Sequence, residues 1–208
     1  MINLKDNDLV FAKVKPDAII PTKKTENAGY DIYACFEEDF VVIPPCSTKL
    51  IPTGIASAVS DKYYLQVHER GSTGSKGMKY GAGVVDSSYR GEIFICINNI
   101  NNYEIVISKL SEEELIKKHA KRMTFDMLNH HDEWLEIHYG ENDERSIFVS
   151  EENDNKLEEG VILYPYSKAI AQLVVHEVPV MNQYEITYEE LLQIPSERGI
   201  GALGSSGK

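Results

Sequence analysis

Short runs of β-branched and aromatic residues recur along most of the chain, and Gly, Pro, Asn and Ser separate them. Runs bounded in this way predict β-strands, and the clearest ones span residues 40–43, 63–67, 92–97 and 170–176. After Glu92 the third run is nearly continuous in apolar character, which predicts a strand buried on both faces. Many short strands without strand–helix alternation predict an all-β sandwich or barrel and argue against a Rossmann-like domain.

Residues 104–158 have a different pattern. Ser111-Glu-Glu-Glu114 is a capping box, in which the first and last side chains bond each other's backbone N–H groups. Leu110 and Leu115 occupy the positions of a hydrophobic staple. Apolar residues then recur with the helical period, and this stripe consists of Ile116, Ala120, Met123 and Met127. The pattern predicts a helix over residues 112–129.

Two apolar runs follow this helix, at residues 134–139 and 146–149, and a polar loop joins them, which predicts a β-hairpin. The segment 104–158 contains 15 Asp and Glu against 7 Lys and Arg, so it carries −8 of the net charge of −12. Pattern and charge together predict a helix-plus-hairpin insertion in a β-fold. The predicted core covers residues 1–103 and 159–195.

The composition predicts a soluble protein. Of its residues 42% are hydrophobic, and no apolar run approaches the ~20 residues that span a bilayer. Residues 1–6 contain no signal-peptide apolar core, so we expect a cytoplasmic protein that binds no membrane. The net charge of −12 argues against non-specific nucleic-acid binding, which needs a cationic surface. Cys35, Cys46 and Cys96 are scattered and form no CxxC pair, which predicts neither a disulfide framework nor a zinc site.

Two stretches combine Gly, Ser and a cation, at residues 70–77 and 198–208. Gly lets the backbone approach an anion, Ser donates hydrogen bonds, and Arg pairs with a phosphate through two parallel bonds. The second stretch is not a Walker P-loop, because Ala202 replaces the required Gly and no Ser or Thr follows Lys208. Each stretch alone is a weak signal, since Gly/Ser-rich tails are usually flexible ends.

Five polar, glycine-rich stretches follow one another along the chain, at residues 28–34, 70–77, 83–93, 169–175 and 198–207. Taken together and in this order, they closely resemble the five motifs of the trimeric dUTPase family. The resemblance covers residues 28–103 and 159–208, and its most specific part is Gly83-Val-Val-Asp-Ser-Ser-Tyr-Arg-Gly91. It implies a jelly-roll-like β-clip fold, a homotrimer with active sites shared among subunits, and hydrolysis of dUTP to dUMP and pyrophosphate.

By this resemblance, Asp86 is the catalytic carboxylate that deprotonates the water attacking the α-phosphate. Tyr89 packs under the deoxyribose and excludes a ribose 2′-OH. A hairpin around residues 80–85, which includes Gly83 and Val85, reads the uracil edge through backbone groups. Outside this motif, an Asp in a turn more often forms an Asx-turn, and a strand Tyr is more often simply half-buried.

The resemblance also assigns phosphate contacts to Arg70, Ser72 and Gln172. A mobile C-terminal arm, residues 196–208, is expected to close over the site as a lid. Asp31 matches a carboxylate near the metal and the phosphates. It is expected to act on Mg²⁺ through water, because this ion keeps several waters and binds through phosphate oxygens. The expected arm contacts are Arg198 on the γ-phosphate, Leu203, Gly204, Ser205 and Ser206.

Three positions depart from the family pattern. The residue after Arg70 is usually Ser but here is Gly71, so either Ser72 supplies the hydroxyl or one phosphate bond is lost. Leu203 replaces a Phe that stacks on the uracil, which weakens arm closure by roughly 0.5–1.5 kcal/mol. Ser88 replaces the second acid of the third motif. We expect these changes to reduce efficiency more than they reduce the activity itself.

Two other functions remain open from the sequence. A dCTP deaminase shares the fold and uses a Glu-centred site, for which Glu92 is the only nearby candidate. A degenerate family member would bind nucleotide or protein without turnover. The presence of Asp86, Gln172 and Arg198 argues against the second alternative.

The insertion raises the question of a protein partner. Some phage members of the family carry an insertion at the same place that binds a repressor protein, so residues 104–158 are a candidate docking element. The alternative is a surface decoration. The histidines of this segment have spacings that fit no standard metal-binding motif, so solvated side chains are favoured. They are His119, His130, His131 and His138.

Overall fold

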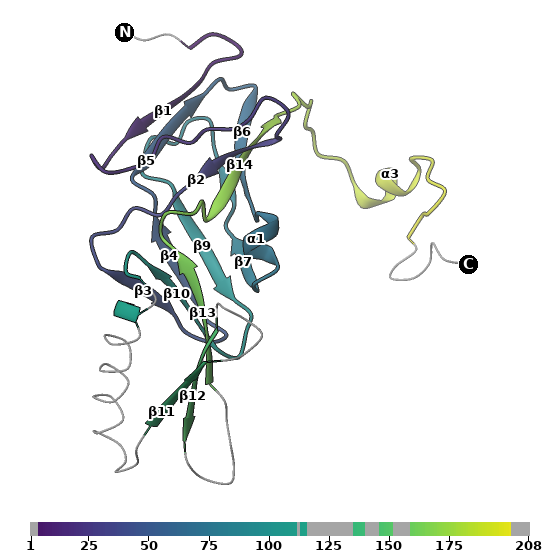
Figure 1. Ribbon diagram of the computed structural model, residues 1–208. Helices are drawn as coiled ribbons and strands as arrows, with labels where there is room; N and C mark the ends of the chain where they lie inside the picture. Colours follow the sequence, from purple (N-terminus) through teal and green to yellow (C-terminus); the bar gives the residue numbers. More distant parts are fainter. Residues whose placement is uncertain (1–3, 112, 116–134, 140–145, 152–158, 201–208) are drawn as a thin grey trace. The chain divides into compact units, whose positions relative to one another are not determined.

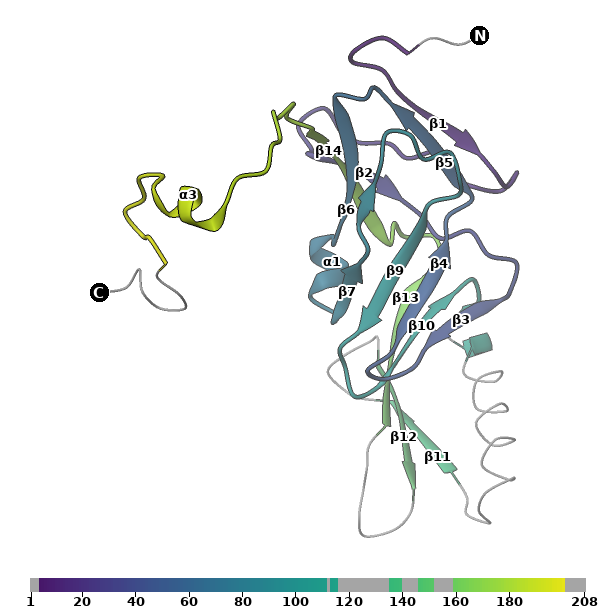
Figure 2. The same ribbon diagram turned by 180° about the vertical axis from the view of Figure 1, so that it is seen from behind.

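A computed structural model describes residues 4–111, 113–115, 135–139, 146–151 and 159–200. The chain divides into two compact units, Met1–Val178 and Pro179–Lys208. The first consists mostly of β-strands, as the sequence predicts (Figures 1 and 2). In the portion described, no helix is long and apolar enough to cross a membrane. The strands are β1 (Leu9–Lys13), β2 (Gly29–Ile32), β3 (Phe40–Ile43), β4 (Thr48–Pro52), β5 (Ile55–Val59), β6 (Tyr63–His68), β7 (Met78–Gly81), β8 (Val84–Val85), β9 (Phe94–Asn99), β10 (Glu104–Ser108), β11 (Leu135–Tyr139), β12 (Ser146–Glu151), β13 (Glu159–Pro165) and β14 (Ala171–Glu177).

A four-stranded sheet, in the order β2-β14-β6-β8, carries several of the predicted site residues. Buried and partly exposed positions alternate through most of β6 and the first half of β14, with Leu65 and Leu173 fully buried. Gln172 lies opposite Asp31 on one side and opposite His68 on the other. Because cross-strand partners share a face, these three side chains lie on the outer face of the sheet.

Strand β9 lies in a second sheet, in the order β4-β9-β7, and differs from its prediction. Ile95 and Ile97 are buried, but Phe94 is 44% exposed and Cys96 is partly exposed. Leu50, the partner of Cys96 in β4, is 60% exposed. The expectation that this strand is buried on both faces is therefore wrong within a single chain. Only one face meets the core. The other carries Leu50, Phe94 and Cys96 and is uncovered by the described part of the chain.

A third sheet, in the order β11-β12-β13-β10-β3, joins the predicted insertion to the core. Strands β10 and β13 are parallel, so the chain between them must cross from one end of the sheet to the other. Strand β10 begins at Glu104, inside the predicted insertion, yet Ile105 and Ile107 are fully buried in the main core. The core therefore extends through Ser108, beyond the predicted boundary.

The predicted capping box is present at the start of the insertion. The Ser111 N–H donates to Glu114 Oε2 at 3.1 Å, and the Glu114 N–H donates to Ser111 Oγ at 3.3 Å. Leu110 and Leu115 belong to one apolar cluster. Residues 113–115 are helical, and the rest of the predicted helix lies outside the described residues. Strands β11 and β12 pair antiparallel where the hairpin was predicted.

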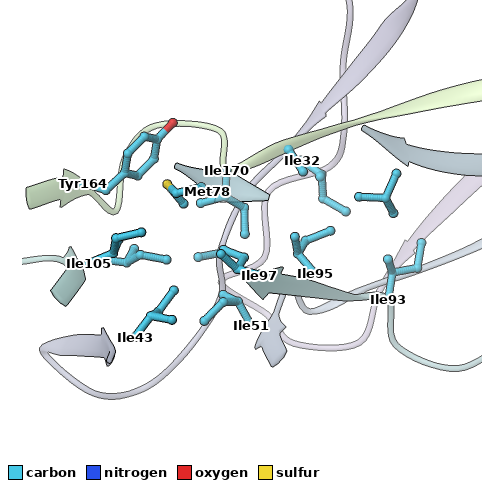
Figure 3. Packing of buried hydrophobic residues seen from close by; sticks show 14 of the residues in the cluster. Ile32, Ile43, Ile51, Met78, Ile93, Ile95, Ile97, Ile105, Tyr164 and Ile170 are labelled. Carbon is cyan, nitrogen blue, oxygen red and sulfur yellow. The ribbon is translucent and has the colours of Figure 1, made fainter. Parts of the chain in front are cut away.

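The core joins the sheets through isoleucines that face one another, together with Met78 and Tyr164 (Figure 3). Tyr164 is almost fully buried, and its hydroxyl donates to the carbonyl of Ala169 at 2.7 Å, so its polar end is satisfied. Truncating one such isoleucine to Ala costs about 2–5 kcal/mol, so this core fixes the strands that carry the site. The isoleucines that are fully buried include Ile32, Ile43, Ile51, Ile95, Ile97, Ile105 and Ile170.

The segment 80–85 is a corner between sheets and not the predicted hairpin. Strand β7 pairs with β9, whereas β8 pairs with β6, so the chain changes sheets at Ala82 and Gly83. Ala82 has a φ of 48°, a left-handed conformation that is uncommon for a residue other than Gly. The turn is thus dictated by the two sheets that it connects.

Candidate active site

Arg70 and Asp31 form the centre of a polar cluster. Arg70 immediately precedes the short helix α1 (Gly71–Gly74), and Asp31 lies in β2. Arg70 Nε donates to Asp31 Oδ1 at 2.9 Å, and Nη2 donates to Oδ2 at 3.3 Å. Burial disfavours the guanidinium charge, but the attraction of Asp31 outweighs burial and raises the pKa of Arg70 above its ordinary value. The two bonds fix the plane of the guanidinium group.

The other guanidinium nitrogen of Arg70 reaches two further groups. Nη1 donates to Ser72 Oγ and to the carbonyl of Ala169, both at 3.3 Å. Ser72 is exposed, so its hydroxyl is held beside the guanidinium at the surface. The structure therefore brings together the predicted phosphate contacts Arg70 and Ser72. A Cβ added at Gly71 would meet no other atom within 4 Å.

Gln172 joins the same cluster from β14. Its Nε2 donates to the carbonyl of Glu69 at 2.8 Å, directly before Arg70. Gly29 makes room for it, because a Cβ at this position would lie 2.6 Å from Gln172 Oε1. Gly29, in the first predicted stretch, thus leaves space for Gln172, in the fourth. We call the set of Asp31, Arg70, Ser72 and Gln172 the Arg70 cluster.

Asp86 and Tyr89 lie on a separate segment that follows β8. Asp86 is exposed, and its carbonyl accepts the N–H of Tyr89 at 3.1 Å to form a turn. Tyr89 is 46% exposed, and its hydroxyl donates to the carbonyl of Glu92 at 3.0 Å. Gly91 allows this conformation, since a Cβ there would lie 2.4 Å from the Tyr89 hydroxyl. Within the described ranges, no hydrogen bond or ion pair engages the Asp86 carboxylate.

Val85 and Gly83, which are predicted to read the base, differ in their surroundings. Val85 is buried against the core. The carbonyl of Gly83 accepts the N–H of Val67 at 2.7 Å, so one of its lone pairs is already used inside the chain. Any reading of a base by Gly83 must therefore rely on its N–H or on the remaining lone pair.

The register of the sheet separates Asp86 from the Arg70 cluster within one chain. On β6, Val85 lies opposite Leu65, whereas Gln172 lies opposite His68, three residues away. At about 3.3 Å per residue this is roughly 10 Å along the strands. In addition, β6 lies between β8 and β14, which separates them sideways by two strand spacings, again roughly 10 Å.

The remaining predicted contacts belong to the C-terminal unit. It contains the short helix α3 (Tyr188–Leu192) and, nearer its end, a turn in which the Gly199 N–H donates to Ser196 Oγ at 3.1 Å. Arg198 lies in this turn. The roles assigned to Leu203, Gly204, Ser205 and Ser206 fall on residues outside the described ones, so they stay predictions.

The sequence analysis missed several residues that shape the Arg70 cluster. Thr73, Tyr80, Ala169 and Glu69 contribute mainly through backbone groups or through bonds to backbone groups. Such contacts have no side-chain signature, and any residue type offers a carbonyl. Tyr80 is the exception, because a Tyr next to a glycine-rich turn is a visible feature.

Glu92, the residue on which a deaminase interpretation depends, is engaged inside the chain. Its Oε1 accepts the N–H of Gly54 at 2.7 Å and lies 4.0 Å from Lys15 Nζ. Among the residues described, no group of three or more His, Cys, Asp or Glu side chains comes together that could hold a metal ion.

Comparison with known proteins identifies the family. The family model described as dUTPase matches residues 15–111. The deoxyuridine 5′-triphosphate nucleotidohydrolase of Wolinella succinogenes is 33% identical over 133 residues, which cover 55% of this chain and 85% of the relative. That of Leptospira interrogans is 31% identical over 99 residues, covering 46% of this chain and 68% of the relative. The chain belongs to the deoxyuridine 5′-triphosphate nucleotidohydrolase (dUTPase) family.

Solved structures support the same fold. The dUTPase of Staphylococcus bacteriophage 80alpha with dUPNHPP has a TM-score of 0.60 at 21% identity, and the match covers 97% of this chain and 99% of that one. The dUTPase from phage phi11 of S. aureus, described with a species-specific insert, has a TM-score of 0.53 at 18% identity, covering 88% and 99%. At these identities the likeness establishes the dUTPase fold.

Proposed function

We propose that this protein hydrolyses dUTP to dUMP and pyrophosphate, with Asp86 as the general base. Asp86 takes a proton from a water molecule as the water oxygen bonds to the α-phosphorus. The bond from that phosphorus to the oxygen bridging to the β-phosphate breaks, and pyrophosphate leaves with the electron pair. The observation that carries this proposal is the Asp86 carboxylate, which is exposed and unengaged by the described residues of its own chain.

The Arg70 cluster supplies the phosphate contacts. Arg70 presents a cation whose orientation Asp31 fixes, and the Ser72 hydroxyl lies beside it at 3.3 Å. Ser72 thereby supplies one hydroxyl to the phosphates, whereas Gly71 supplies none. Gln172 completes this set, and Arg198, Ser205 and Ser206 add contacts when the arm closes.

The base and sugar are recognised next to Asp86. Tyr89 supports the deoxyribose with an exposed ring and leaves no space for a 2′-OH. The backbone of the corner at residues 80–85 binds the uracil edge, with Gly83 and Val85 in this segment and Leu203 covering the base from the arm.

Mg²⁺ is the expected cofactor, held mainly by the phosphates of the substrate, where it supplies charge for the leaving pyrophosphate. Asp31 is the residue that would face it. Both oxygens of the Asp31 carboxylate already accept bonds from Arg70, which fits an indirect contact through water better than direct coordination. A phage phi11 dUTPase structure describes a structural Mg(II) ion.

A homotrimer explains two features of the chain together. Asp86 and the Arg70 cluster are separated by roughly 10 Å along the strands and by roughly 10 Å across them. In a trimer with shared sites, the Asp86 segment of one subunit meets the Arg70 cluster of another. The apolar outer face of the β4-β9-β7 sheet, with Leu50 and Phe94, gains a partner at the same time.

The first test is the chemistry itself. The protein with Mg²⁺ is incubated with dUTP and, separately, with dCTP, and both pyrophosphate and ammonia are measured. We expect pyrophosphate from dUTP and no ammonia from dCTP. Ammonia from dCTP would favour the deaminase alternative, and absence of both products would favour a family member that binds without turnover.

The insertion is the proposed docking element for a repressor-type protein. Because β10 belongs to the core, the appropriate test replaces residues 112–158 with a flexible linker of about a dozen residues, enough for the crossover between β10 and β13. Turnover of dUTP should persist, and binding to purified phage repressors should be lost. Binding that survives the replacement would place the docking surface elsewhere.

A further inference from the structure

Tyr80, near the end of β7, is joined to the Arg70 cluster through both its backbone and its side chain. Its hydroxyl donates to the carbonyl of Ile170, two residues before Gln172. Its N–H donates to Glu69 Oε1 at 3.3 Å, on the residue before Arg70. We propose that Tyr80 is a positioning residue that holds the phosphate-binding arms of the site, Arg70 and Gln172, at a fixed separation. This inference rests on the proposed function.

The carbonyl of Ile170, which Tyr80 binds, lies next to a second carbonyl that accepts hydrogen bonds from other side chains. The carbonyl of Ala169, next to Ile170, accepts Arg70 Nη1 at 3.3 Å and the Tyr164 hydroxyl at 2.7 Å. Two phenols therefore bind consecutive carbonyls immediately before β14. A shift of this segment would move the acceptor of Arg70 and the start of the strand that carries Gln172 together.

The Tyr80 phenol is suited to this task because it remains a donor. Burial raises the pKa of Tyr80 well above its ordinary value, so the hydroxyl stays protonated near neutral pH. The ring also packs against the main core, which anchors it independently of the hydroxyl. Removing only the oxygen therefore frees the carbonyl of Ile170 while keeping the packing.

Because Tyr80 supports the phosphate-binding residues, loss of its hydroxyl should affect some ligands more than others. The Arg70 cluster meets the phosphates, and Tyr89 meets the sugar. The base meets the backbone of the corner at residues 80–85, which the pairing of β7 with β9 holds without the Tyr80 hydroxyl. Loss of the Tyr80 hydroxyl should weaken binding of a triphosphate and leave binding of the monophosphate almost unchanged. A residue with a purely structural role would not divide the ligands in this way.

The test compares Tyr80→Phe with the parent and with Tyr63→Phe, a control that removes an exposed phenol bonded to Asn7 Oδ1 at 3.3 Å. The affinities for dUMP and for the non-hydrolysable analogue dUpNHpp are measured with Mg²⁺ by titration calorimetry. We expect Tyr80→Phe to weaken dUpNHpp by about 5–10-fold, the scale of one hydrogen bond between neutral groups, and to change dUMP by less than about twofold. Tyr63→Phe should change neither.

Three outcomes overturn the role of Tyr80: no change for dUpNHpp, an equal loss for both ligands, or the same loss in the Tyr63→Phe control. Thermal denaturation shows whether each variant is folded, and a variant that melts early is titrated in the cold, where failure to bind dUMP also counts against the proposal. A parent that neither binds dUpNHpp nor releases pyrophosphate from dUTP removes the proposed function and this inference together. An active parent beside an unaffected Tyr80→Phe removes the inference alone.

Discussion

The Arg70 cluster and the Asp86 segment are two polar regions of one chain with opposite character. In the cluster, Arg70 uses three nitrogens on three partners, and Gln172 is bonded to the backbone beside it. In the segment, Asp86 and Tyr89 are exposed, and hydrogen bonds tie them only to their own turn. One region is organised in advance by bonds within the chain, and the other presents a carboxylate that has no hydrogen bond or ion pair to the described part of the chain.

The difference indicates how catalytic work is divided. Binding phosphate demands several donors at fixed positions, and preorganisation lowers the entropy cost of holding a flexible triphosphate. A general base must instead reach a water molecule, and an internal salt bridge would lower its basicity. In the proposed function the two regions act together although they lie apart in the chain, and the proposed homotrimer would join them.

The largest expected effect comes from Asp86→Asn. It should lower kcat for dUTP by about a thousandfold, because a positioned general base contributes ~10²–10⁴. The free energy of unfolding should change by less than about 0.5 kcal/mol, because Asp86 is exposed. Pyrophosphate release and chemical denaturation check both parts, with Ser88→Ala in the same turn as the control. Turnover close to that of the parent would remove Asp86 from the mechanism.

Leu50→Glu should have the next largest effect, by separating the subunits. A carboxylate on the apolar face of the β4-β9-β7 sheet cannot be buried without a large cost, so the trimer should dissociate. Turnover should fall about a hundredfold, since a shared site exists only in the assembled protein. Sedimentation measures the assembly, and Val14→Glu, at another exposed apolar position, is the control. A fully assembled Leu50→Glu trimer would show that this face is not the interface.

Asp31→Asn removes the anion that orients Arg70. The KM for dUTP should rise about tenfold through loss of a charge-assisted contact. The unfolding free energy should fall by at most about 1 kcal/mol, because both side chains are about a third exposed and solvent screens the pair. Steady-state kinetics and denaturation test this, beside the exposed control Asp17→Asn. An unchanged KM would mean that Arg70 keeps its place without Asp31.

Gly71→Ser should have the smallest effect, in the favourable direction. The position has room for a Cβ, so the hydroxyl can be added without moving a neighbour. We expect the KM for dUTP to fall about threefold if the new hydroxyl reaches a phosphate. Gly71→Ala adds the Cβ without the hydroxyl and is the matched control. Equal behaviour of the two variants would show that Ser72 already supplies this contact.

Much of the fold follows from local pattern, and the exceptions have physical causes. The strands around Phe40 and Leu65 and the capping box at Ser111 depend on neighbours in sequence, and they lie where predicted. Whether Phe94 is buried depends on what covers that face of the sheet, and the periodicity of the sequence does not reveal this. The extent of the core at Ile105 and the corner at Ala82 depend on which strands pair, a long-range property.

For the candidate site, the motif positions identified side chains but not their surroundings. Arg70, Ser72 and Gln172 lie in one cluster, and their contacts to phosphates stay predictions. The supports of these residues, such as the carbonyl of Ala169, are backbone atoms that no motif records. The sequence shows that residue 29 is a glycine but not why. The pairing of β2 with β14 gives the reason, because a side chain at Gly29 would collide with Gln172.

The most direct test of the account mixes two inactive variants, Asp86→Asn and Arg70→Gln, by refolding them together. If Asp86 of one subunit serves the Arg70 cluster of another, random trimers contain about a quarter of intact sites, and dUTP turnover should return to about a quarter of the parent value. Mixing Asp86→Asn with Tyr89→Ala, which damage the same segment, should restore nothing. An Asp86→Asn and Arg70→Gln mixture that stays as inactive as its components would contradict the shared site.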